Sequence, residues 1–593
     1  MPNHAALAQA LEDLRRNPEQ LDAARATGNC VVLAGPGSGK TKTLTTAMAR
    51  TLVEDVAEPR GVACITYNNE CSIELEERLA RLGIESSGRV FIGTVHGFAL
   101  SQVLSPYARC VPEVLPADFR VATTQEARAA VEFAYEEVFG GWGDPHSRWG
   151  FAAEKRRRDV DRRLPAWRER NPELADFIEA YERRLRALEL IDFDDMPLLA
   201  YRLIRDHAWI RSAMRARFPI LFVDEYQDLG HALHELVLLL CFDAGVRLFA
   251  VGDVDQSIYG FTGANPELLH GLTERPDVTT IRLRFNYRSG AKIIRASLGA
   301  LGEERDYCGI DGAPEGELSF WPVTFGHADQ ARHIAEKVVP ALLAKGIASD
   351  QIAVLYRTAG HGDTVAAALE AAGLPLVRSD RNALVKRGSR LARFVEACAN
   401  WVTGGWRNAD PPYGRLLRQA VSLVHTGRVT EAQQQEVSGR LIAFLRGGIG
   451  SGETTNEWLR RFCRDLIGPW QAIATIQQQE WEVCSEMVAR TDPSQGRDMP
   501  LNVFSGRIEG NGRITLSTLH SAKGREFDAV VMFGVNAEDF PDWRDRRTER
   551  GMREARRLFY VGVTRARREV CLVFQQAHHS PWVAELYRRS QQA

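Results

Sequence analysis

Short apolar runs, each followed by polar residues, recur along the chain and set the first expectation for its fold. They occupy residues 30–34, 61–66, 220–223, 247–251, 279–283, 352–356, 514–517 and 529–533. Runs that are apolar throughout, rather than alternating, are typical of strands buried on both faces in a parallel sheet. The pattern therefore predicts parallel sheets covered by helices, with ligands bound at the carboxyl ends of the strands.

Two longer stretches between these runs have a helical composition. Residues 100–189 are rich in Ala, Glu and Arg, whereas residues 382–504 include a run of Gln at 433–435 and a Gly-rich break at 446–452. Both stretches are predicted to be helical insertions into α/β domains. A chain of 593 residues is also too long for one hydrophobic core, so several domains are expected.

The composition narrows the class of protein without revealing its function. Hydrophobic residues make up 45% and charged residues 26% of the chain, which are the proportions of a soluble globular protein. The net charge of -2 neither requires nor excludes nucleic acid, because a binding groove needs only a local basic stripe. The 10 cysteines form no C-x-x-C pair, so we expect buried thiols in a reducing compartment. No signal peptide and no membrane-spanning run are visible, so a cytoplasmic location is expected.

Residues 34–41 carry the clearest chemical signal in the chain. They read Ala-Gly-Pro-Gly-Ser-Gly-Lys-Thr, directly after an apolar run and at the start of a predicted helix. This is the P-loop pattern, whose glycines let backbone N–H groups wrap a β-phosphate. Lys40 is expected to reach the β- and γ-phosphates, and the Thr41 hydroxyl is expected to bind Mg²⁺. The pattern predicts binding of a nucleoside triphosphate but not what the nucleotide drives.

A second signal for the same site follows the apolar run at 220–223, which ends in Asp224 and Glu225. A strand that ends in two carboxylates suits a Walker B motif. Asp224 is expected to hold Mg²⁺ through water, and Glu225 is expected to act as the general base on the attacking water. An acidic turn after a strand is common by itself, but together with the P-loop it favours a site of nucleotide hydrolysis.

The segment from Val223 to Asp228, Val-Asp-Glu-Tyr-Gln-Asp, resembles motif II of the UvrD/Rep/PcrA-type superfamily 1A helicases. Segments that resemble the other motifs of this family occur in the family's order and span nearly the whole chain. They are Asn-Pro-Glu-Gln at 17–20 (Q motif), Ile-Thr-Tyr-Asn-Asn at 65–69 (motif Ia), Gly-Thr-Val-His-Gly-Phe at 93–98 (Ib), Ile-Asp-Phe-Asp-Asp at 191–195, Gly-Asp-Val-Asp-Gln-Ser-Ile-Tyr at 252–259 (III), Asn-Tyr-Arg-Ser at 286–289 (IV), Thr-Leu-His-Ser-Ala-Lys-Gly-Arg-Glu-Phe at 518–527 (V) and Arg-Leu-Phe-Tyr-Val-Gly-Val-Thr-Arg at 557–565 (VI).

The resemblance implies an α/β fold with two RecA-like P-loop NTPase motor domains, each a parallel sheet interrupted by a helical insertion. The implied units are 1–99 with 190–277 for the first motor domain, 100–189 for its insertion, 278–381 with 505–593 for the second motor domain, and 382–504 for its insertion. ATP and Mg²⁺ are the implied cofactors.

The family pattern also implies contacts to the base and sugar of the nucleotide. Gln20 would recognise adenine and Tyr287 would stack on it, while Glu526 would contact the sugar and phosphate side. The complete set of residues predicted to bind the nucleotide is Gln20, Gly35, Gly37, Ser38, Gly39, Lys40, Thr41, Lys42, Tyr287 and Glu526.

Three further residues are implied to act on the γ-phosphate. Gln256 would sense this group from the first motor domain, and Arg288 and Arg565 would reach it from the second domain as arginine fingers. Hydrolysis would then require the two domains to close on the nucleotide. The predicted catalytic set is Lys40, Asp224, Glu225, Gln256, Arg288 and Arg565, with Thr41 and Asp224 as metal ligands.

Aromatic and histidine side chains in the motif segments are predicted to hold single-stranded DNA, because aromatic faces stack on bases of any sequence. The residues are Tyr67, Asn68, His96, Tyr259, Phe261 and His520. An aromatic residue at a strand end is more often part of the core when considered alone. For the two histidines, a phosphate or sugar contact and a loop histidine satisfied within the protein are equally open.

The densest basic segment lies inside the first predicted insertion and supports two interpretations. Its cations are Lys155, Arg156, Arg157, Arg158, Arg162, Arg163, Arg168 and Arg170. They would suit a contact to the DNA backbone, whose strength would depend on salt. The interleaved acidic residues fit a solvated helix held by ion pairs equally well.

The chain departs from the family pattern in ways that bear on unwinding. The family usually has Phe-Arg-Gly-Ala after motif III, whereas residues 261–264 are Phe-Thr-Gly-Ala, and Arg525 stands where Leu is usual. The second insertion is shorter than in the long members, in which it regulates unwinding. Translocation along a strand is therefore a safer expectation than strand separation.

The favoured prediction is an ATP-dependent 3′-to-5′ translocase or helicase that acts on single-stranded DNA and DNA junctions in repair, recombination or defence, with polarity taken only from the resemblance. The alternative is a DNA-sensing ATPase switch that regulates a partner, such as a nuclease or repair factor, without productive unwinding. A helicase–nuclease fusion is disfavoured because the chain ends soon after Arg565. An ATPase indifferent to DNA is disfavoured by the full set of motifs, and no membrane partner is expected.

Overall fold

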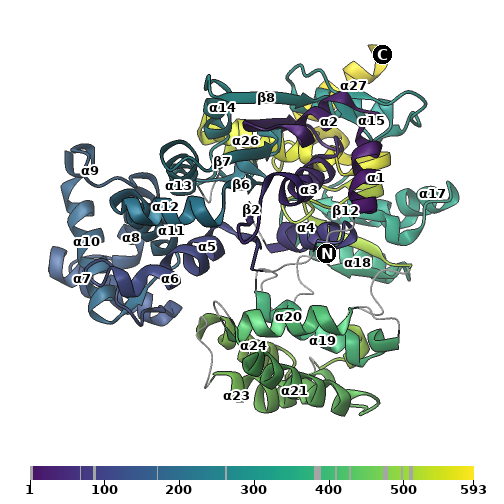
Figure 1. Cartoon of the computed structure of the whole chain (residues 1–593). Helices are drawn as coiled ribbons and strands as arrows, with labels where there is room; N and C mark the ends of the chain where they lie inside the picture. Colours follow the sequence, from purple (N-terminus) through teal and green to yellow (C-terminus); the bar gives the residue numbers. More distant parts are fainter. Residues whose placement is uncertain are drawn as a thin grey trace.

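A computed structural model gives the fold of the chain (Figure 1). The residues that the structure describes are 4–66, 69–84, 88–169, 171–260, 263–378, 389–407, 411–425, 429–471, 478–495, 498–505 and 512–592.

The first unit of the fold, which we call the first lobe, is built on a parallel sheet. Among the described residues this sheet has 6 strands in the order β3-β2-β6-β7-β1-β8, and every neighbouring pair is parallel. The strands are β1 Asn29–Ala34, β2 Val62–Thr66, β3 Val90–Thr94, β6 Ile220–Val223, β7 Arg247–Gly252 and β8 Val278–Leu283. All of the apolar runs that the sequence marks between 30 and 283 are strands of this sheet, and β3 is an additional strand.

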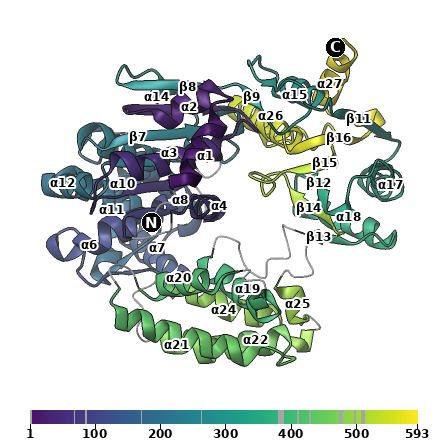
Figure 2. The same ribbon diagram turned by 45° about the vertical axis from the view of Figure 1, so that its right-hand side comes forward.

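The second lobe is built on another parallel sheet, with 6 strands in the order β11-β16-β15-β12-β14-β13 within the described part of the chain. The strands are β11 Glu317–Val323, β12 Ile352–Tyr356, β13 Leu376–Arg378, β14 Ile514–Thr518, β15 Phe527–Met532 and β16 Ala566–Gln575. The expected α/β architecture with two parallel sheets is confirmed, and Figure 2 shows the two sheets beside each other.

Helices cover both sheets and form the two insertions. The helices of the first lobe are α1 His4–Leu14, α2 Pro18–Arg25, α3 Lys40–Arg50, α4 Asn69–Arg81, α5 Val95–Phe98, α6 Ser105–Tyr107, α11 Asp195–Asp206, α12 Ala208–Arg217, α13 His231–Leu238 and α14 Glu267–Thr273. Those of the second lobe are α15 Ala291–Leu301, α16 His327–His333, α17 Val339–Ala344, α18 Ala359–Ala371, α26 Glu549–Val563 and α27 Pro581–Gln592.

The insertions are helical, as the composition predicts. The first contains α7 Thr124–Phe139, α8 Pro145–Arg158, α9 Ala166–Glu169 and α10 Pro172–Ala187, and the second contains α19 Arg390–Val402, α20 Tyr413–Val424, α21 Glu431–Gly448, α22 Thr455–Phe462, α23 Gly468–Gln471, α24 Gln478–Arg490 and α25 Leu501–Phe504. Short strand pairs join β4 Arg120–Val121 to β5 Leu190–Ile191 and β9 Phe285–Asn286 to β10 Cys308–Gly309.

Strand β1 shows why these runs are apolar throughout. Val31 packs into the core on one face of the first sheet, while Cys30 and Val32 pack into the core on the other face. Successive side chains of a strand point to opposite faces, so helices on both faces bury the whole run. Each fully buried Val or Leu contributes roughly 1.5–3 kcal/mol relative to an exposed side chain.

The boundary predicted between residues 277 and 278 is wrong in one respect. Strand β8, assigned to the second motor domain by that boundary, pairs with β1 from Asn29↔Val278 to Ala34↔Leu283. The chain therefore leaves the first sheet only after residue 283. The apolar run marked this strand correctly, but a run by itself does not reveal which sheet it joins.

The predicted start of the first insertion at residue 100 also lies inside a packed core. Val103, Leu104 and Leu115 belong to the same buried cluster as Val31 of the first sheet. A separate cluster, which runs from Ala122 to Leu190, forms the core of the insertion itself. The independently packed part of the insertion thus begins at β4 and ends at β5.

The described cations of the basic segment in this insertion pair with carboxylates, as one of its two interpretations predicts. Arg156 is fully buried, and its guanidinium pairs with Glu182, Asp192 and Asp195. Lys155, Arg157, Arg158, Arg162, Arg163 and Arg168 also pair with carboxylates. Arg170 lies outside the described residues. Arg156, Arg157 and Arg168 therefore tie α8 and α9 to α10 and to the start of α11.

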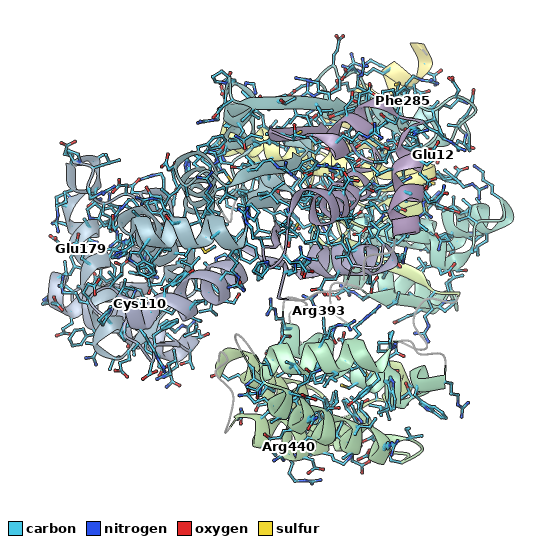
Figure 3. All side chains as sticks on the ribbon, in the orientation of Figure 1. Glu12, Cys110, Glu179, Phe285, Arg393 and Arg440 are labelled. Atoms are coloured by element: carbon cyan, nitrogen blue, oxygen red, sulfur yellow. The ribbon has the colours of Figure 1, made fainter. Side chains whose placement is uncertain are left out.

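The second insertion has its own core, which includes Trp458 and Trp470 and lies below both lobes in Figures 1 and 2. Figure 3 shows Arg393 of α19 on the side that faces the lobes and Arg440 on the opposite side. An ion pair of 3.0 Å joins Arg415 Nη1 of α20 to Glu77 Oε1 of α4. This contact ties the insertion to the first lobe.

None of the cysteines is in a disulfide, and Cys110 and Cys308 are exposed, in contrast to the buried thiols that the sequence predicts. No helix among the described residues is long and apolar enough to cross a membrane.

Replacing Arg156 with Met is expected to destabilise the protein by about 3–5 kcal/mol, because the change removes a buried cation that three carboxylates share. The matched control is Arg157→Met, whose partly exposed ion pair with Asp194 contributes about 0–1 kcal/mol. Urea unfolding followed by circular dichroism measures both effects. Equal unfolding midpoints for the two variants would contradict the structural role of Arg156.

Candidate functional site

The P-loop turns from β1 into α3 through two glycines in the left-handed region of backbone space. The φ angle is 69° at Gly37 and 83° at Gly39. A Cβ atom at Gly37 would collide with the Asn286 side chain, and one at Gly39 would collide with Gln20. Only glycine fits these positions. The turn leaves the N-terminal N–H groups of α3 facing the loop, which is the arrangement that binds phosphate.

Lys40 is the first residue of α3 and carries the clearest unsatisfied group of the site. Its side chain is 14% exposed, and its Nζ atom is buried without a hydrogen bond from the described residues. The nearest carboxylate oxygen is Asp253 Oδ2, at 3.9 Å. A buried ammonium group without a hydrogen bond is costly, so the site fits an anion that reaches this nitrogen.

Asp224 and Glu225 follow β6, as the sequence predicts, and lie on the same side of the sheet as the P-loop. The Asp224 N–H donates to Ile65 O at 3.0 Å, which continues the pairing of β6 with β2. Glu225 has a φ of 51°. A non-glycine residue in this region is strained, and such strain is concentrated at functional sites.

Burial and nearby charges shift the pKa values of the three carboxylates of this site in different directions. Burial raises the pKa of Asp224, and the neighbouring Glu225 carboxylate raises it further. Burial also raises the pKa of Asp253, and the positive charge of Lys40 offsets only part of this rise. For Glu225, burial is outweighed by the charges of Lys40 and Lys523, so its pKa is lowered. A divalent cation beside Asp224 would offset the negative charge that raises the pKa of that residue.

Gln227, which the sequence reasoning did not single out, connects the two acidic segments. Its Nε2 donates to the Glu225 carboxylate, and its Oε1 accepts from the Asp253 N–H at 2.9 Å. The side chain is completely buried. It therefore fixes the orientation of Glu225 relative to the loop after β7. The only signal in the sequence was its position two residues after Glu225.

The second lobe reaches this site through Arg565, which follows α26. Its Nη2 donates to Gln256 Oε1 at 3.1 Å, and Gln256 Nε2 donates in turn to Asp253 Oδ2 at 2.6 Å. Lys40 and Gln256 thus both adjoin Asp253, and Arg565 joins them through Gln256. Burial, together with the nearby charge of Arg288, lowers the pKa of Arg565 to about 10. Two cations that approach each other here favour an anion between them.

Lys523 is a second contact between the lobes, and the sequence reasoning gave it no role. Its Nζ pairs with Asp228 Oδ2 and donates to Gln256 O at 2.8 Å. Both side chains are nearly inaccessible, at 8% for Lys523 and 1% for Asp228. Burial raises the pKa of Asp228 to about 6, and Lys523 opposes this effect. The ion pair is therefore buried, and it holds motif V against motif II.

The predicted base-binding residues Gln20 and Tyr287 contact the backbone of the P-loop at Ser38 and Gly37. Gln20 Nε2 donates to Ser38 O at 2.7 Å, and the Tyr287 N–H donates to Gly37 O at 2.8 Å. Asn17, missed as a site residue, caps α2 and donates to the Tyr287 hydroxyl at 2.9 Å. The Tyr287 side chain remains 43% exposed. A tyrosine held beside the P-loop with an open face suits stacking against a base.

Three other predicted residues are engaged by protein groups. Arg288 Nε lies 2.5 Å from Glu526 Oε2, and Glu526 also pairs with Arg567. Lys42 Nζ lies 3.7 Å from Asp13 Oδ2 in a largely exposed pair. Any contact of these three with a nucleotide would require the ion pairs to rearrange.

A cavity of about 540 Å³ lies behind the P-loop. Its lining includes Ala34, Asp253 and Arg557 but not Lys40 or Asp224. Tyr307 lines this cavity and packs against Gly35, where an added Cβ would lie 2.6 Å from Tyr307 Cε1. The cavity therefore adjoins Asp253 but is not the space beside Lys40.

The described residues among those predicted to hold DNA, His96, Tyr259 and His520, lie just past the carboxyl ends of sheet strands. The Tyr259 hydroxyl of the first lobe donates to His520 O of the second lobe at 3.4 Å. The His96 ring stacks on Phe193, with centroids 3.8 Å apart and an interplanar angle of 19°. Phe193 is 53% exposed and was missed, although it lies in the quoted segment 191–195. Predicted contacts Tyr67, Asn68 and Phe261 lie outside the described residues.

Burial keeps the two predicted histidines neutral. It lowers the pKa of His96 to about 4 and that of His520 to about 4, the latter with a further contribution from Arg357. Neither imidazole therefore offers a positive charge to a phosphate at neutral pH in the structure. A contact through ring stacking or a neutral hydrogen bond remains compatible with this geometry.

Comparison with known proteins connects this site to a family. Residues 16–277 match the model of the UvrD/REP helicase N-terminal domain, and residues 504–577 match that of the UvrD-like helicase C-terminal domain. The chain belongs to the UvrD/REP helicase family. The expected family is thus confirmed, and the two matched regions contain Lys40, Asp224, Gln256 and Arg565.

Relatives within the UvrD/REP helicase family align along most of the chain. DNA helicase II of Salmonella typhimurium is 26% identical over 639 residues, which cover 97% of this chain and 86% of the relative. ATP-dependent DNA helicase PcrA of Leuconostoc citreum is 25% identical, with 94% and 81% covered. ATP-dependent DNA helicase UvrD1 of Mycobacterium tuberculosis is 27% identical, with 93% and 81% covered.

Replacing Lys523 with Met is expected to open the two lobes. The change breaks a buried ion pair, which costs about 3–5 kcal/mol, so the ratio of closed to open molecules should fall on the order of a hundredfold or more. Single-molecule energy transfer between dyes on the two lobes measures this ratio. The matched control is Lys345→Met, because Lys345 pairs with Glu317 and Glu569 inside the second lobe. A Lys523 variant as closed as the control would show that the pair does not join the lobes.

The lowered pKa of His96 predicts how stability depends on pH. The unfolded imidazole has a pKa near 6.5, whereas the folded one has a pKa of about 4, so the folded state excludes a proton. The stabilising contribution is complete above about pH 6.5 and is lost as pH falls toward 4, by at most about 1.4 kcal/mol per pH unit. Over this range the unfolding free energy of His96→Asn should decline less steeply with falling pH than that of the wild type. The exposed-site variant His270→Asn should decline as steeply as the wild type. Equal slopes in all three proteins would contradict a neutral, buried His96.

Proposed function

We propose that the chain is an ATP-dependent motor that moves 3′-to-5′ along single-stranded DNA and unwinds duplex DNA at junctions. Membership of the UvrD/REP helicase family supports this function, and so do relatives named DNA helicase II and ATP-dependent DNA helicase that align along most of the chain. ATP is the proposed fuel, Mg²⁺ is the proposed metal, and the cytoplasm is the proposed location.

The contact from Arg565 to Gln256 supports this proposal, because it would bring a cation of the second lobe to the proposed phosphate site of the first lobe. A triphosphate bound by Lys40 would be neutralised fully only when the lobes are together. Binding would then favour closure, and release of phosphate would favour opening. Repeated closure and opening is the physical basis for movement along a polymer.

The residues of the site suit hydrolysis of the γ-phosphate. Glu225 would accept the proton of the attacking water, with its orientation fixed by Gln227. Arg565 and Arg288 would neutralise the charge that develops on the transferred phosphoryl group. Asp224 and Thr41 would hold Mg²⁺, which supplies further charge neutralisation when bound. The buried Lys40 ammonium and the raised pKa of Asp224 support the fit of phosphate and metal.

The carboxyl edges of the two sheets support a track for single-stranded DNA. Tyr259 and His520 come from different lobes and touch through a hydrogen bond of 3.4 Å. A strand that lies across this contact would be gripped by both lobes, so closure would shift one grip relative to the other. Phe193, exposed beside His96, adds an aromatic face at the same edge of the first sheet.

The proposed biological setting is DNA repair, recombination or defence, with a nuclease or repair factor as the proposed partner protein. Because residues 261–264 and Arg525 depart from the family pattern, a second function is also proposed, an ATPase switch that senses DNA. Such a switch would use the same nucleotide site without separating strands.

The decisive experiment measures ATP hydrolysis with and without single-stranded DNA, together with strand displacement on duplexes that carry a 3′ or a 5′ tail. We expect DNA to stimulate hydrolysis and only the 3′-tailed duplex to be separated. Glu225→Gln should retain binding of ATP and DNA but lose roughly 10²–10⁴-fold in turnover, because it removes the general base. Lys40→Ala should lose turnover through weakened phosphate binding.

Lys345→Ala is the control for these variants, since Lys345 lies in an ion-pair cluster remote from the site. Stimulated hydrolysis without displacement on either duplex would favour the DNA-sensing switch. Hydrolysis that is indifferent to DNA, or normal turnover in Glu225→Gln, would refute the motor and its assigned base.

A further inference from the structure

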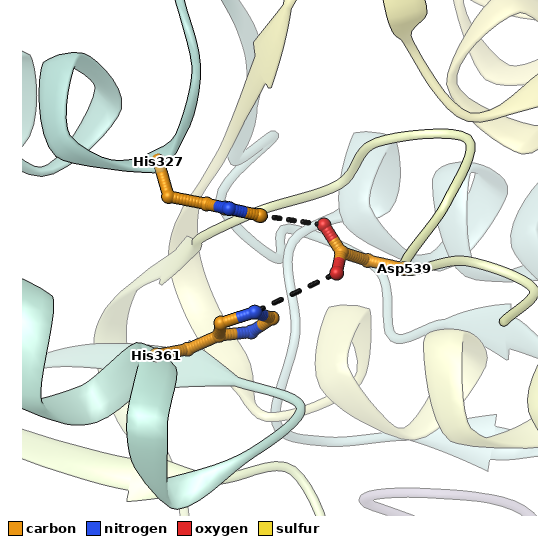
Figure 4. Close-up of side chains that lie close together, drawn as sticks. All are labelled: His327, His361 and Asp539. Atoms are coloured by element: carbon orange, nitrogen blue, oxygen red, sulfur yellow. Dashed lines mark hydrogen bonds and ion pairs between the residues drawn. The ribbon is translucent and has the colours of Figure 1, made fainter.

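Two histidines and an aspartate meet at the carboxyl edge of the second sheet, outside the nucleotide site. His327 begins α16 after β11, His361 lies in the first turns of α18 after β12, and Asp539 lies in the loop after β15. Figure 4 shows both imidazole rings directed toward the Asp539 carboxylate. These residues are outside the quoted motif segments, so the proposed function gives them no role.

The three side chains are close enough to share one ligand. His327 Nε2 lies 2.7 Å from Asp539 Oδ2, and His361 Nε2 lies 3.5 Å from Asp539 Oδ1. The two imidazole rings are 4.6 Å apart, and one ligand atom from each residue lies within 4.8 Å of the others. The side chains are 31%, 19% and 12% exposed in the order His327, His361, Asp539. The cluster is thus largely enclosed but open to solvent on one side.

This donor set has the chemistry of a transition-metal site. Two imidazole nitrogens and one carboxylate oxygen suit Zn²⁺ and related ions, whereas Mg²⁺ and Ca²⁺ prefer oxygen ligands alone. Metal–ligand bonds of about 2.0–2.2 Å place the ligand atoms of one ion a few ångströms from one another. The ligand atoms of these three residues already lie within 4.8 Å of one another. Three protein ligands leave a coordination position for water, and this fits the open side of the cluster.

The buried side chain of Asn536 orients the Asp539 carboxylate. Asn536 Nδ2 donates to Asp539 Oδ2 at 3.0 Å, and Asn536 Oδ1 accepts from Gln330 Nε2 at 3.0 Å and from the Gln575 N–H at 2.8 Å. Asn536 and Gln330 are completely buried. Groups that fix ligand orientation in this way are typical of metal sites. Asn536 Nδ2 also lies 3.1 Å from His327 Nε2, a contact that bound metal would replace.

We propose that His327, His361 and Asp539 bind one divalent transition-metal ion of the zinc class, with water in the remaining position. The ion joins the segments that follow β11, β12 and β15. Arg357 links this site to the DNA edge: its Nη1 donates to Asp539 O at 3.0 Å, and its charge acts on His520. Bound metal therefore braces the edge of the second lobe on which the proposed DNA track lies.

The test uses the full chain, stripped of metal with a chelator and kept in excess Mg²⁺ so that oxygen-only sites are filled. Co²⁺ is added as a spectroscopic probe, and Zn²⁺ bound after dialysis is measured by elemental analysis. We expect one equivalent per chain, a Co²⁺ visible spectrum typical of nitrogen and oxygen ligands, and a higher melting temperature with Zn²⁺. His327→Gln and His361→Gln should bind more than roughly 100-fold more weakly.

The matched control is His333→Gln, which removes a histidine from the same helix as His327 and should bind metal like the wild type. The melting temperature of the wild type tests the proposal even if a variant fails to fold. No uptake and no Zn²⁺-dependent stabilisation in the wild type would show that the cluster is only a hydrogen-bonded trio. Equal uptake by the wild type and a folded His327 or His361 variant would place the metal elsewhere and overturn the assignment.

Discussion

The hydrogen bond from Arg565 to Gln256 is the contact on which the rest of the molecule depends. It crosses from the second lobe to the first and brings a cation of one lobe to the proposed phosphate site of the other. Burial and the nearby Arg288 both disfavour the charge on Arg565. The closed arrangement is therefore poised for an anion, because a bound phosphate would relieve the strain that the two arginines impose on each other.

A short series of side chains extends from this contact in both directions. Gln256 holds Asp253, Asp253 is fixed by Gln227, and Gln227 orients Glu225. In the other direction, Lys523 donates a hydrogen bond to Gln256 O. The segment of Lys523 also contains His520, whose carbonyl accepts a hydrogen bond from Tyr259. The phosphate site and the edge proposed for DNA are thus separated by few contacts. Coupling between them requires only small shifts of buried groups, since packed interiors transmit displacement.

The sequence predicted those parts of the fold and site that are encoded locally. The P-loop and the strand before it were recognisable because glycine spacing and an apolar run lie next to each other in the chain. The sheet to which β8 belongs was not recognisable, because pairing with β1 is a non-local contact. Likewise, residues 103–121 look like part of a helical insertion, yet they pack into the core of the first lobe. Gln227 was missed because its partner Asp253 follows a different strand, β7, and Lys523 was missed because its partner Asp228 lies on the other lobe. The roles of Tyr67, Asn68 and Phe261 stay predictions.

The first insertion is joined to its lobe through the paired strands β4 and β5, so the chain enters and leaves it at one narrow neck. A neck of two strands would ordinarily act as a pivot. Here, however, Arg156 of the insertion is buried against Asp192 and Asp195, which lie at the lobe end of the neck. Any swivel of the insertion would draw this arginine away from its carboxylates. These ion pairs therefore restrain the orientation of the insertion relative to the first lobe.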